Sequence, residues 1–248
     1  MQKNTHFGMQ SVSSHEKKKL VMGVFSSVAE KYDLMNDAMS LGVHRLWKKT
    51  MLSKCQARHG DTVLDVAAGS ADISLGLFKK VGASGQVVFS DLNAAMLHEG
   101  AQRVLDHGIL FQQMCAVQAD GSRLPFADNS FNVVSISFGI RNFVDIERGL
   151  SEFYRVLKPG GQFICLEFSH PDLPMLDVVY DAYSYQVIPW LGEQLVNDRD
   201  SYQYLVESIR RFPNQKRFSK LIQWAGFDMV RYQNMSGGIV ALHRGYKI

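Results

Sequence analysis

The chain of 248 residues is poor in cysteine and proline, and it lacks an apolar run long enough to cross a bilayer. The three cysteines, Cys55, Cys115 and Cys165, lie too far apart for a zinc-binding pattern, and their odd number does not suit a disulfide framework. We therefore expect a reducing cytoplasm and no bound metal. Because no apolar stretch of about 20 residues occurs, no segment is expected to span a membrane. The first ten residues also lack the apolar core of a signal peptide.

Charge of either sign is modest as well. The formal net charge is +3 at pH 7, and 21% of the residues are charged. Nucleic-acid-binding proteins usually carry clustered positive charge, so we expect no nucleic-acid partner. The single basic run, Lys17-Lys18-Lys19, is interpreted as a solvated helix face, with attraction to anionic lipid headgroups as the alternative.

Short apolar segments alternate with helical patterns through the middle of the chain. Strands are predicted at residues 62–66, 86–90, 115–119, 132–138 and 162–168, and helices at 15–32, 43–53, 71–80, 94–106 and 145–157. This alternation predicts an open α/β sheet with helices on both faces. The C-terminal part differs, because helices at 201–211 and 215–224 precede strands at 228–235 and 239–246. Ser236-Gly237-Gly238 between these two strands is a hairpin signal.

We interpret residues 1–248 as a single domain with four parts. A helical cover (1–55) begins with about 14 loose polar residues. A cofactor-binding core (56–169) follows, then an insertion that forms a lid (170–213), and finally a helix with two strands (214–248).

The turn after the first strand of the core limits the choice of ligand. Residues 65–72 read Asp-Val-Ala-Ala-Gly-Ser-Ala-Asp, with a single glycine where a dinucleotide fingerprint has three. Those glycines let the backbone approach a pyrophosphate. S-adenosylmethionine carries no phosphate, so the turn argues against a dinucleotide and weakly for this methyl donor.

Two aspartates follow the next two strands. Asp91 ends the second strand about 20 residues after the turn, where an acidic residue commonly accepts hydrogen bonds from ribose hydroxyls. Asp120 follows the third strand and is a candidate acceptor for an adenine amino group, with Gly121 leaving room for the ring. As alternatives, Asp91 caps the helix that starts near Ala94, and Asp120 begins a turn.

Beyond these residues, the chain resembles the ubiquinone/menaquinone biosynthesis C-methyltransferase family of class I S-adenosylmethionine methyltransferases. The resemblance covers nearly the whole chain. Its segments are residues 5–8 (THFG), 24–37 (VFSSVAEKYDLMND), 42–48 (GVHRLWK), 135–142 (SISFGIRN), 154–161 (YRVLKPGG), 180–184 (YDAYS), 200–205 (DSYQYL) and 241–246 (ALHRGY).

The resemblance implies a class I, Rossmann-like doubly wound sheet, mostly parallel, with a C-terminal antiparallel hairpin. It implies S-adenosylmethionine as co-substrate, no metal, and cofactor contacts at Ser70, Asp91, Asp120, Gly121 and Ser137. This chain has Ala68 and Ala71 where the family usually has glycine. If either position needs a positive φ, alanine costs about 1–2 kcal/mol there.

The resemblance also implies methyl transfer to a ring carbon of a reduced, polyprenylated quinol. Arg141 is the first candidate for the quinol site, where a permanent cation stabilises a developing phenolate. An ion pair with Asp145 or Glu147 is the alternative for this arginine. Tyr183 is a second catalytic candidate, and Tyr180 and His170 are weaker candidates near the quinol. Tyr32 and Asp33 belong to the helical cover and are expected to close over the site.

The expected partners follow from such a substrate. A quinol with a long tail lives in the bilayer, so we expect a cytoplasmic protein in loose contact with the inner face of the membrane, as a homodimer or within a quinone-biosynthesis complex. Two other functions stay open from sequence: methylation of another phenolic small molecule, and a non-catalytic scaffold with a methyltransferase fold.

Overall fold

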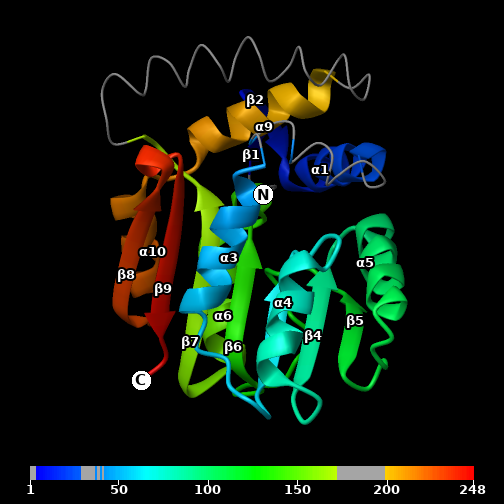
Figure 1. Cartoon of the computed structure of the whole chain (residues 1–248). Helices are drawn as coiled ribbons and strands as arrows, with labels where there is room; N and C mark the ends of the chain where they lie inside the picture. Colours follow the sequence, from blue (N-terminus) through cyan, green and yellow to red (C-terminus); the bar gives the residue numbers. More distant parts are fainter. Residues whose placement is uncertain (1–3, 29–36, 38–39, 41, 172–198) are drawn as a thin grey trace.

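The structure is a computed structural model that describes residues 4–28, 37, 40, 42–171 and 199–248. A seven-stranded sheet in the order β5-β4-β3-β6-β7-β9-β8 forms its centre (Figure 1). Neighbouring strands from β5 to β7 pair in parallel, whereas β9 pairs antiparallel with both β7 and β8. The predicted fold class is therefore confirmed. The strands are β3 (Thr62–Val66), β4 (Gln86–Asp91), β5 (Met114–Gln118), β6 (Phe131–Ser137), β7 (Leu157–Phe168), β8 (Asp228–Met235) and β9 (Val240–Tyr246).

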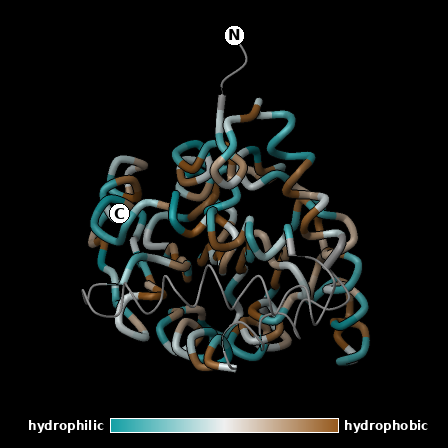
Figure 2. The backbone as a smooth tube through the Cα atoms, turned by 90° about the horizontal axis from the view of Figure 1, so that it is seen from above, coloured by the Kyte–Doolittle hydropathy of each residue, from teal (hydrophilic) through white to brown (hydrophobic). Residues whose placement is uncertain are grey.

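Helices cover both faces of this sheet, because the central strands are apolar on both sides. On β3, Val63 belongs to one buried cluster and Leu64 to the other. The first cluster includes side chains of α3 (His44–Lys54), α4 (Asp72–Val81) and α5 (Ala94–Asp106), and the second those of α6 (Ile146–Val156) and α10 (Gln215–Trp224). Seen from above, hydrophobic stretches run through the middle of the molecule (Figure 2).

The N-terminal segment and α9 (Arg199–Arg211) lie above the carboxyl ends of the parallel strands (Figure 1). We predicted loose residues before the first helix, and that prediction is wrong: β1 (Asn4–Phe7) and β2 (Gln10–Ser13) form a hairpin that leads into α1 (Ser14–Val28). Contacts with α9 hold this hairpin in place. The Phe7 and Tyr204 rings stack with centroids 4.1 Å apart, and the Met9 amide donates to Glu207 Oε2 at 2.8 Å. Such distant partners are not visible in a sequence.

The basic run on α1 also differs from its prediction as a solvated face. Lys17 is buried, and its Nζ donates to the carbonyl of Phe143 at 2.8 Å. Burial lowers the pKa of Lys17 to about 8. Lys18 pairs with Asp120 although its side chain is 44% exposed, and Lys19 is exposed. Two of the three lysines thus face the protein, because α1 lies over the sheet edge with this side inward.

Strand β7 begins at Leu157 rather than at the predicted residue 162, and the remaining predicted elements lie within a few residues of their predicted bounds. Most of the predicted lid, residues 172–198, lies outside the described part of the chain, so its role stays a prediction. Within the described ranges, no helix is both long and apolar enough to cross a membrane.

Candidate functional site

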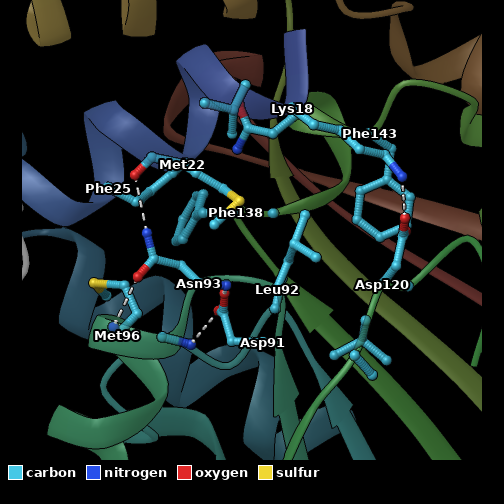
Figure 3. A pocket seen from close by; sticks show the side chains of 18 of the residues that line it. Lys18, Met22, Phe25, Asp91, Leu92, Asn93, Met96, Asp120, Phe138 and Phe143 are labelled. Atoms are coloured by element: carbon cyan, nitrogen blue, oxygen red, sulfur yellow. Dashed lines mark hydrogen bonds and ion pairs between the residues drawn. The ribbon is translucent and has the colours of Figure 1, made fainter. Parts of the chain in front are cut away.

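A pocket lies at the carboxyl ends of the central strands. Strand order reverses at β3, which pairs in parallel with β4 on one side and β6 on the other. Ligands of doubly wound sheets bind at such a point. We call this cavity the strand-end pocket (Figure 3); α1 forms one side of it with Lys18, Val21, Met22 and Phe25, and the rest of its lining is Val66, Ala67, Gly69, Asp91–Asn93, Met96, Ala119–Gly121, Ser137–Gly139 and Asn142–Val144.

The turn after β3 enters this pocket with a left-handed backbone at three positions. Ala67, Gly69 and Ala71 have φ of 51°, 55° and 61°. Of the two alanines singled out in the sequence, only Ala71 therefore has the strained conformation, and Ala67 is an additional one that the sequence did not reveal. Hydrogen bonds fix the turn: the Ala68 amide donates to Ser90 O at 3.0 Å, and the Ala71 amide to Ala68 O at 3.0 Å.

Asp91 ties this turn to the end of β4. Its Oδ2 accepts from the Gly69 amide at 3.0 Å and its Oδ1 from the Asn93 amide at 2.8 Å. Burial raises the pKa of Asp91, and these amide donors offset the rise only in part. The cap of α5 is Asn93, whose Oδ1 accepts from the Ala95 and Met96 amides, so the alternative of Asp91 as the cap is wrong. Asp91 is left facing the pocket with lone pairs available to a diol.

Asp120 faces the same pocket from the loop after β5. Asp120 begins a turn, which confirms the alternative interpretation of this residue. Its Oδ1 accepts from the amide and the hydroxyl of Ser122 at 2.9 and 2.6 Å. Its Oδ2 pairs with Lys18 from α1 (Figure 3). Burial works to raise the pKa of Asp120, but hydrogen bonds from Lys18 and Ser122 outweigh it and lower the pKa. Asp120 is thus an anion whose partner belongs to the helix above the pocket.

Ser137 and Gly121 complete the predicted contacts in this pocket. Ser137 Oγ is buried and has no hydrogen-bond partner within the described residues. A buried hydroxyl without a partner is costly, which points to a polar ligand group beside it. A Cβ on Gly121 would lie 2.3 Å from Phe143 Cζ. The space beside Gly121 therefore holds the Phe143 ring, which lines the pocket where we expected adenine alone.

Ser70 lies in an adjoining cavity on the other side of the turn. This turn pocket shares Ala67, Gly69, Ser137 and Phe138 with the strand-end pocket and is further lined by Lys48, Asp65, Ala68, Ser70, Asp72 and Ile73. Asp65 is fully buried and accepts from Ser74 Oγ and Ser135 Oγ, both at 2.6 Å. Burial raises its pKa to about 6 against those hydrogen bonds. Sequence reasoning missed Asp65, although a carboxylate inside the apolar strand Thr62–Val66 was the available signal.

Arg141 faces a third cavity, the lateral pocket, and is held in place. Its Nη1 lies 2.9 Å from Glu167 Oε1 and also donates to Phe138 O, and its Cζ lies 5.4 Å from the centroid of the Phe168 ring. The ion-pair partner is thus Glu167 on β7, so the alternative of an ion pair with Asp145 or Glu147 is wrong. The lateral pocket shares Phe143 and Val144 with the strand-end pocket, and its lining also includes His6, Lys17, Tyr204, Arg211 and Phe212.

Of the other candidate residues, only His170 belongs to the described part of the chain. Tyr183, Tyr180, Tyr32 and Asp33 are outside the described residues. His170 is described; one ring nitrogen lies 2.8 Å from Phe212 O, and the residue is not part of the linings of the three pockets. Tyr204, which we did not predict, donates from its hydroxyl to Asn142 Oδ1 at 2.9 Å beside Arg141. Burial raises the pKa of Tyr204 to about 12, so it is a neutral donor.

These groups fit S-adenosylmethionine. Carboxylates at the ends of neighbouring strands suit the ribose diol and the adenine amino group, and the unpartnered Ser137 Oγ suits a further polar atom. No dinucleotide fingerprint is present at the turn, where only Gly69 is a glycine. The arrangement can therefore bind an adenosyl group.

Comparisons with known proteins also indicate a methyltransferase. Residues 11–247 match the model of the ubiE/COQ5 methyltransferase family. A protein of Legionella pneumophila strain Philadelphia 1, named ubiquinone/menaquinone biosynthesis C-methyltransferase UbiE, is 51% identical over 98% of this chain and 97% of its own. A Francisella tularensis subsp. novicida protein of the same name is 49% identical over 99% and 98%.

Solved structures support the fold at lower identity. A SAM-dependent methyltransferase from Aquifex aeolicus has a TM-score of 0.59 at 17% identity, covering 81% of this chain and 89% of its own. Phosphoethanolamine N-methyltransferase 2 of Haemonchus contortus has a TM-score of 0.59 at 16% identity, covering 81% and 52%. Given the family match over nearly the whole sequence, the chain is a methyltransferase and belongs to the ubiE/COQ5 methyltransferase family.

Proposed function

We propose that this protein transfers a methyl group from S-adenosylmethionine to a ring carbon of a polyprenylated quinol. Its substrates would be demethylmenaquinol, 2-polyprenyl-6-methoxy-1,4-benzoquinol, or both, in menaquinone and ubiquinone biosynthesis. One observation carries the proposal: Asp91 and Asp120 follow neighbouring parallel strands and line one pocket. The names of relatives about 50% identical over nearly the full chain support the substrate class.

Each predicted cofactor contact receives a role in this proposal. Asp91 accepts hydrogen bonds from the ribose hydroxyls, and Asp120 accepts one from the adenine amino group while Lys18 stays on its other side. Ser137 Oγ gains the partner that it lacks. Gly121 keeps Phe143 against the base, and Ser70 contacts the methionine end from the turn pocket.

The donor supplies an electrophilic methyl group on a sulfonium. The quinol hydroxyl first gives its proton to water, which leaves the phenolate. The bond from methyl carbon to sulfur then breaks with its electron pair left on sulfur, a bond to the ring carbon forms, and that carbon releases its proton to water. Arg141 stabilises the phenolate that makes the ring carbon nucleophilic. Its Nε has no hydrogen-bond partner within the described residues, and Glu167 holds the guanidinium in place. Tyr183 is proposed as a second group near the quinol.

The substrate also sets the proposed location. We place the protein in the cytoplasm, in peripheral contact with the membrane that holds the quinol, with residues 170–213 as a lid over the isoprenoid chain. A carbonate or high-salt wash is expected to release the protein from membranes. Retention after both washes would contradict peripheral contact.

The function is tested by calorimetry followed by quinone analysis. Purified protein is expected to bind S-adenosylmethionine, and cells without the gene are expected to accumulate quinones that lack one ring methyl group. Absence of detectable binding would leave the non-catalytic scaffold as the better candidate. Normal binding with an unchanged quinone profile would favour another phenolic substrate.

A further inference from the structure

The turn pocket combines groups that the adenosyl contacts do not use. Lys48 comes from α3, outside the sheet, and its side chain is only 11% exposed. Its Nζ lies 2.9 Å from Asp72 Oδ2 at the first residue of α4. Burial acts to raise the pKa of Asp72, but nearby positive charge, chiefly that of Lys48 and to a lesser extent that of Arg103, outweighs it and lowers the pKa. A largely buried ammonium therefore lies beside the pocket that adjoins the adenosyl site.

The start of α4 adds positive potential to the same pocket. A helix N-terminus leaves amide donors without partners inside the helix and favours a negative charge. Its N-cap, Ala71, has no side-chain oxygen, and no side-chain cap is made by the described residues. Lys48 lines one small cavity together with Asp72 and Ile73, the first residues of α4. A carboxylate in this cavity would be stabilised by the ammonium group and by the helix N-terminus.

Negative groups lie in the same cavity on the side of the sheet. Asp65 is fully buried at the end of β3, beneath the turn, and Asp72 lies beside Lys48. A ligand with one carboxylate and one ammonium group matches this distribution of charge better than a simple anion or cation does. An α-amino acid is such a ligand. The sulfonium donor carries one, attached to the adenosyl group of the neighbouring pocket.

We infer that Lys48 binds the α-carboxylate of the methyl donor, and that Asp65 faces its ammonium group. The inference rests on the proposed function, since it assigns the methionine end of the same ligand. It makes Lys48 of the N-terminal helical segment a specificity residue, because ligands without the amino-acid end gain nothing from it.

The test compares two ligands that differ in that end. Calorimetry measures binding of S-adenosylhomocysteine, which has the amino-acid end, and of 5′-methylthioadenosine, which lacks it, to the full chain and to Lys48→Met. We expect the substitution to weaken S-adenosylhomocysteine roughly 10- to 100-fold, as expected for a hydrogen bond to a charged group, and to leave methylthioadenosine unchanged. Lys49→Met, at an exposed neighbour on the same helix, is the matched control and is expected to change neither.

Other outcomes separate this inference from the proposed function. If Lys48→Met weakened the binding of both ligands equally, the ion pair with Asp72 would be purely structural and the inference would be overturned. If the substitution weakened the binding of neither ligand, the inference would also be overturned. Wild-type protein that binds neither ligand would overturn the proposed function together with the inference. If circular dichroism shows that Lys48→Met is unfolded, Lys48→Gln replaces it, since glutamine keeps a donor for Asp72 without the charge.

Discussion

The two halves of the sheet bury polar groups for different reasons. In the parallel half, Asp65 and Asp91 lie at strand ends that converge on the pockets. In the antiparallel half, His243 on β9 is enclosed by Phe218 and Tyr232, away from the three pockets described above. Both halves carry groups with shifted pKa values, but of the three groups named here only Asp65 and Asp91 line a pocket. A shifted pKa alone therefore does not mark a site in this protein; strand direction does.

The largest expected effect is on ligand binding through Asp91. Asp91→Ala removes both carboxylate oxygens that we assign to the ribose diol, and it also frees the Gly69 amide. Two charge-assisted hydrogen bonds correspond to a loss of roughly 1000-fold in affinity for S-adenosylmethionine, measured by calorimetry. Asp106→Ala, at an exposed aspartate of α5, is the control and should leave affinity unchanged. A loss below about tenfold for Asp91→Ala would remove the assigned role.

In the antiparallel half, we expect His243 to lower the free energy of unfolding in acid. Burial lowers the pKa of His243 to about 4, with only partial compensation by the contact with Gln215 O. The unfolded chain takes up the proton near pH 6.5, so stability is full above that pH and falls as the pH drops from about 6.5 to 4. The loss is on the order of 3 kcal/mol. His243→Phe should abolish this loss in urea unfolding at pH 7.5 and 4.5, whereas His98→Gln, at an exposed site, should keep it. An unchanged acid loss in His243→Phe would show that another group is responsible.

Asp65 in the parallel half should change stability with pH in the opposite direction to His243. Its pKa is raised to about 6 by burial, so the stability that its protonated form contributes is complete below about pH 3.8 and is lost as the pH rises through 6. Asp65→Asn should raise the free energy of unfolding at pH 7.5 by up to about 3 kcal/mol, with the gain vanishing near pH 3.8. The same variant should bind S-adenosylhomocysteine more weakly. Tighter or unchanged binding would mean that the buried charge serves no ligand.

The smallest effect is expected at Ala71, also in the parallel half. Ala71→Gly relieves a left-handed alanine, worth about 1–2 kcal/mol. It also adds about 0.5–1 kcal/mol of backbone entropy to the unfolded chain and removes a buried methyl group worth about 0.8 kcal/mol. These terms nearly cancel, so the free energy of unfolding should change by less than about 0.5 kcal/mol. A gain above 1 kcal/mol in urea unfolding would show that the alanine strains the turn.

Local patterns were sufficient for the elements of the core and for the order in which they occur. The apolar segments Thr62–Val66 and Gln86–Asp91 are short, bounded by turns and separated by a helical pattern, so their identity as parallel strands could be read directly. The position of Asp91 followed from this topology. The N-terminal hairpin could not be read, because Phe7 and Met9 are held by Tyr204 and Glu207, about 200 residues further along the chain.

The sequence by itself determined the sheet, the family resemblance and the two aspartates that follow neighbouring strands, because hydrophobic period and strand ends are local properties. Only the tertiary structure decided what surrounds them. It brought Lys18 onto Asp120, Lys48 beside the turn pocket and Glu167 to Arg141. Such pairs join residues from separate elements, and a charge in a sequence carries no information about which distant charge it will meet.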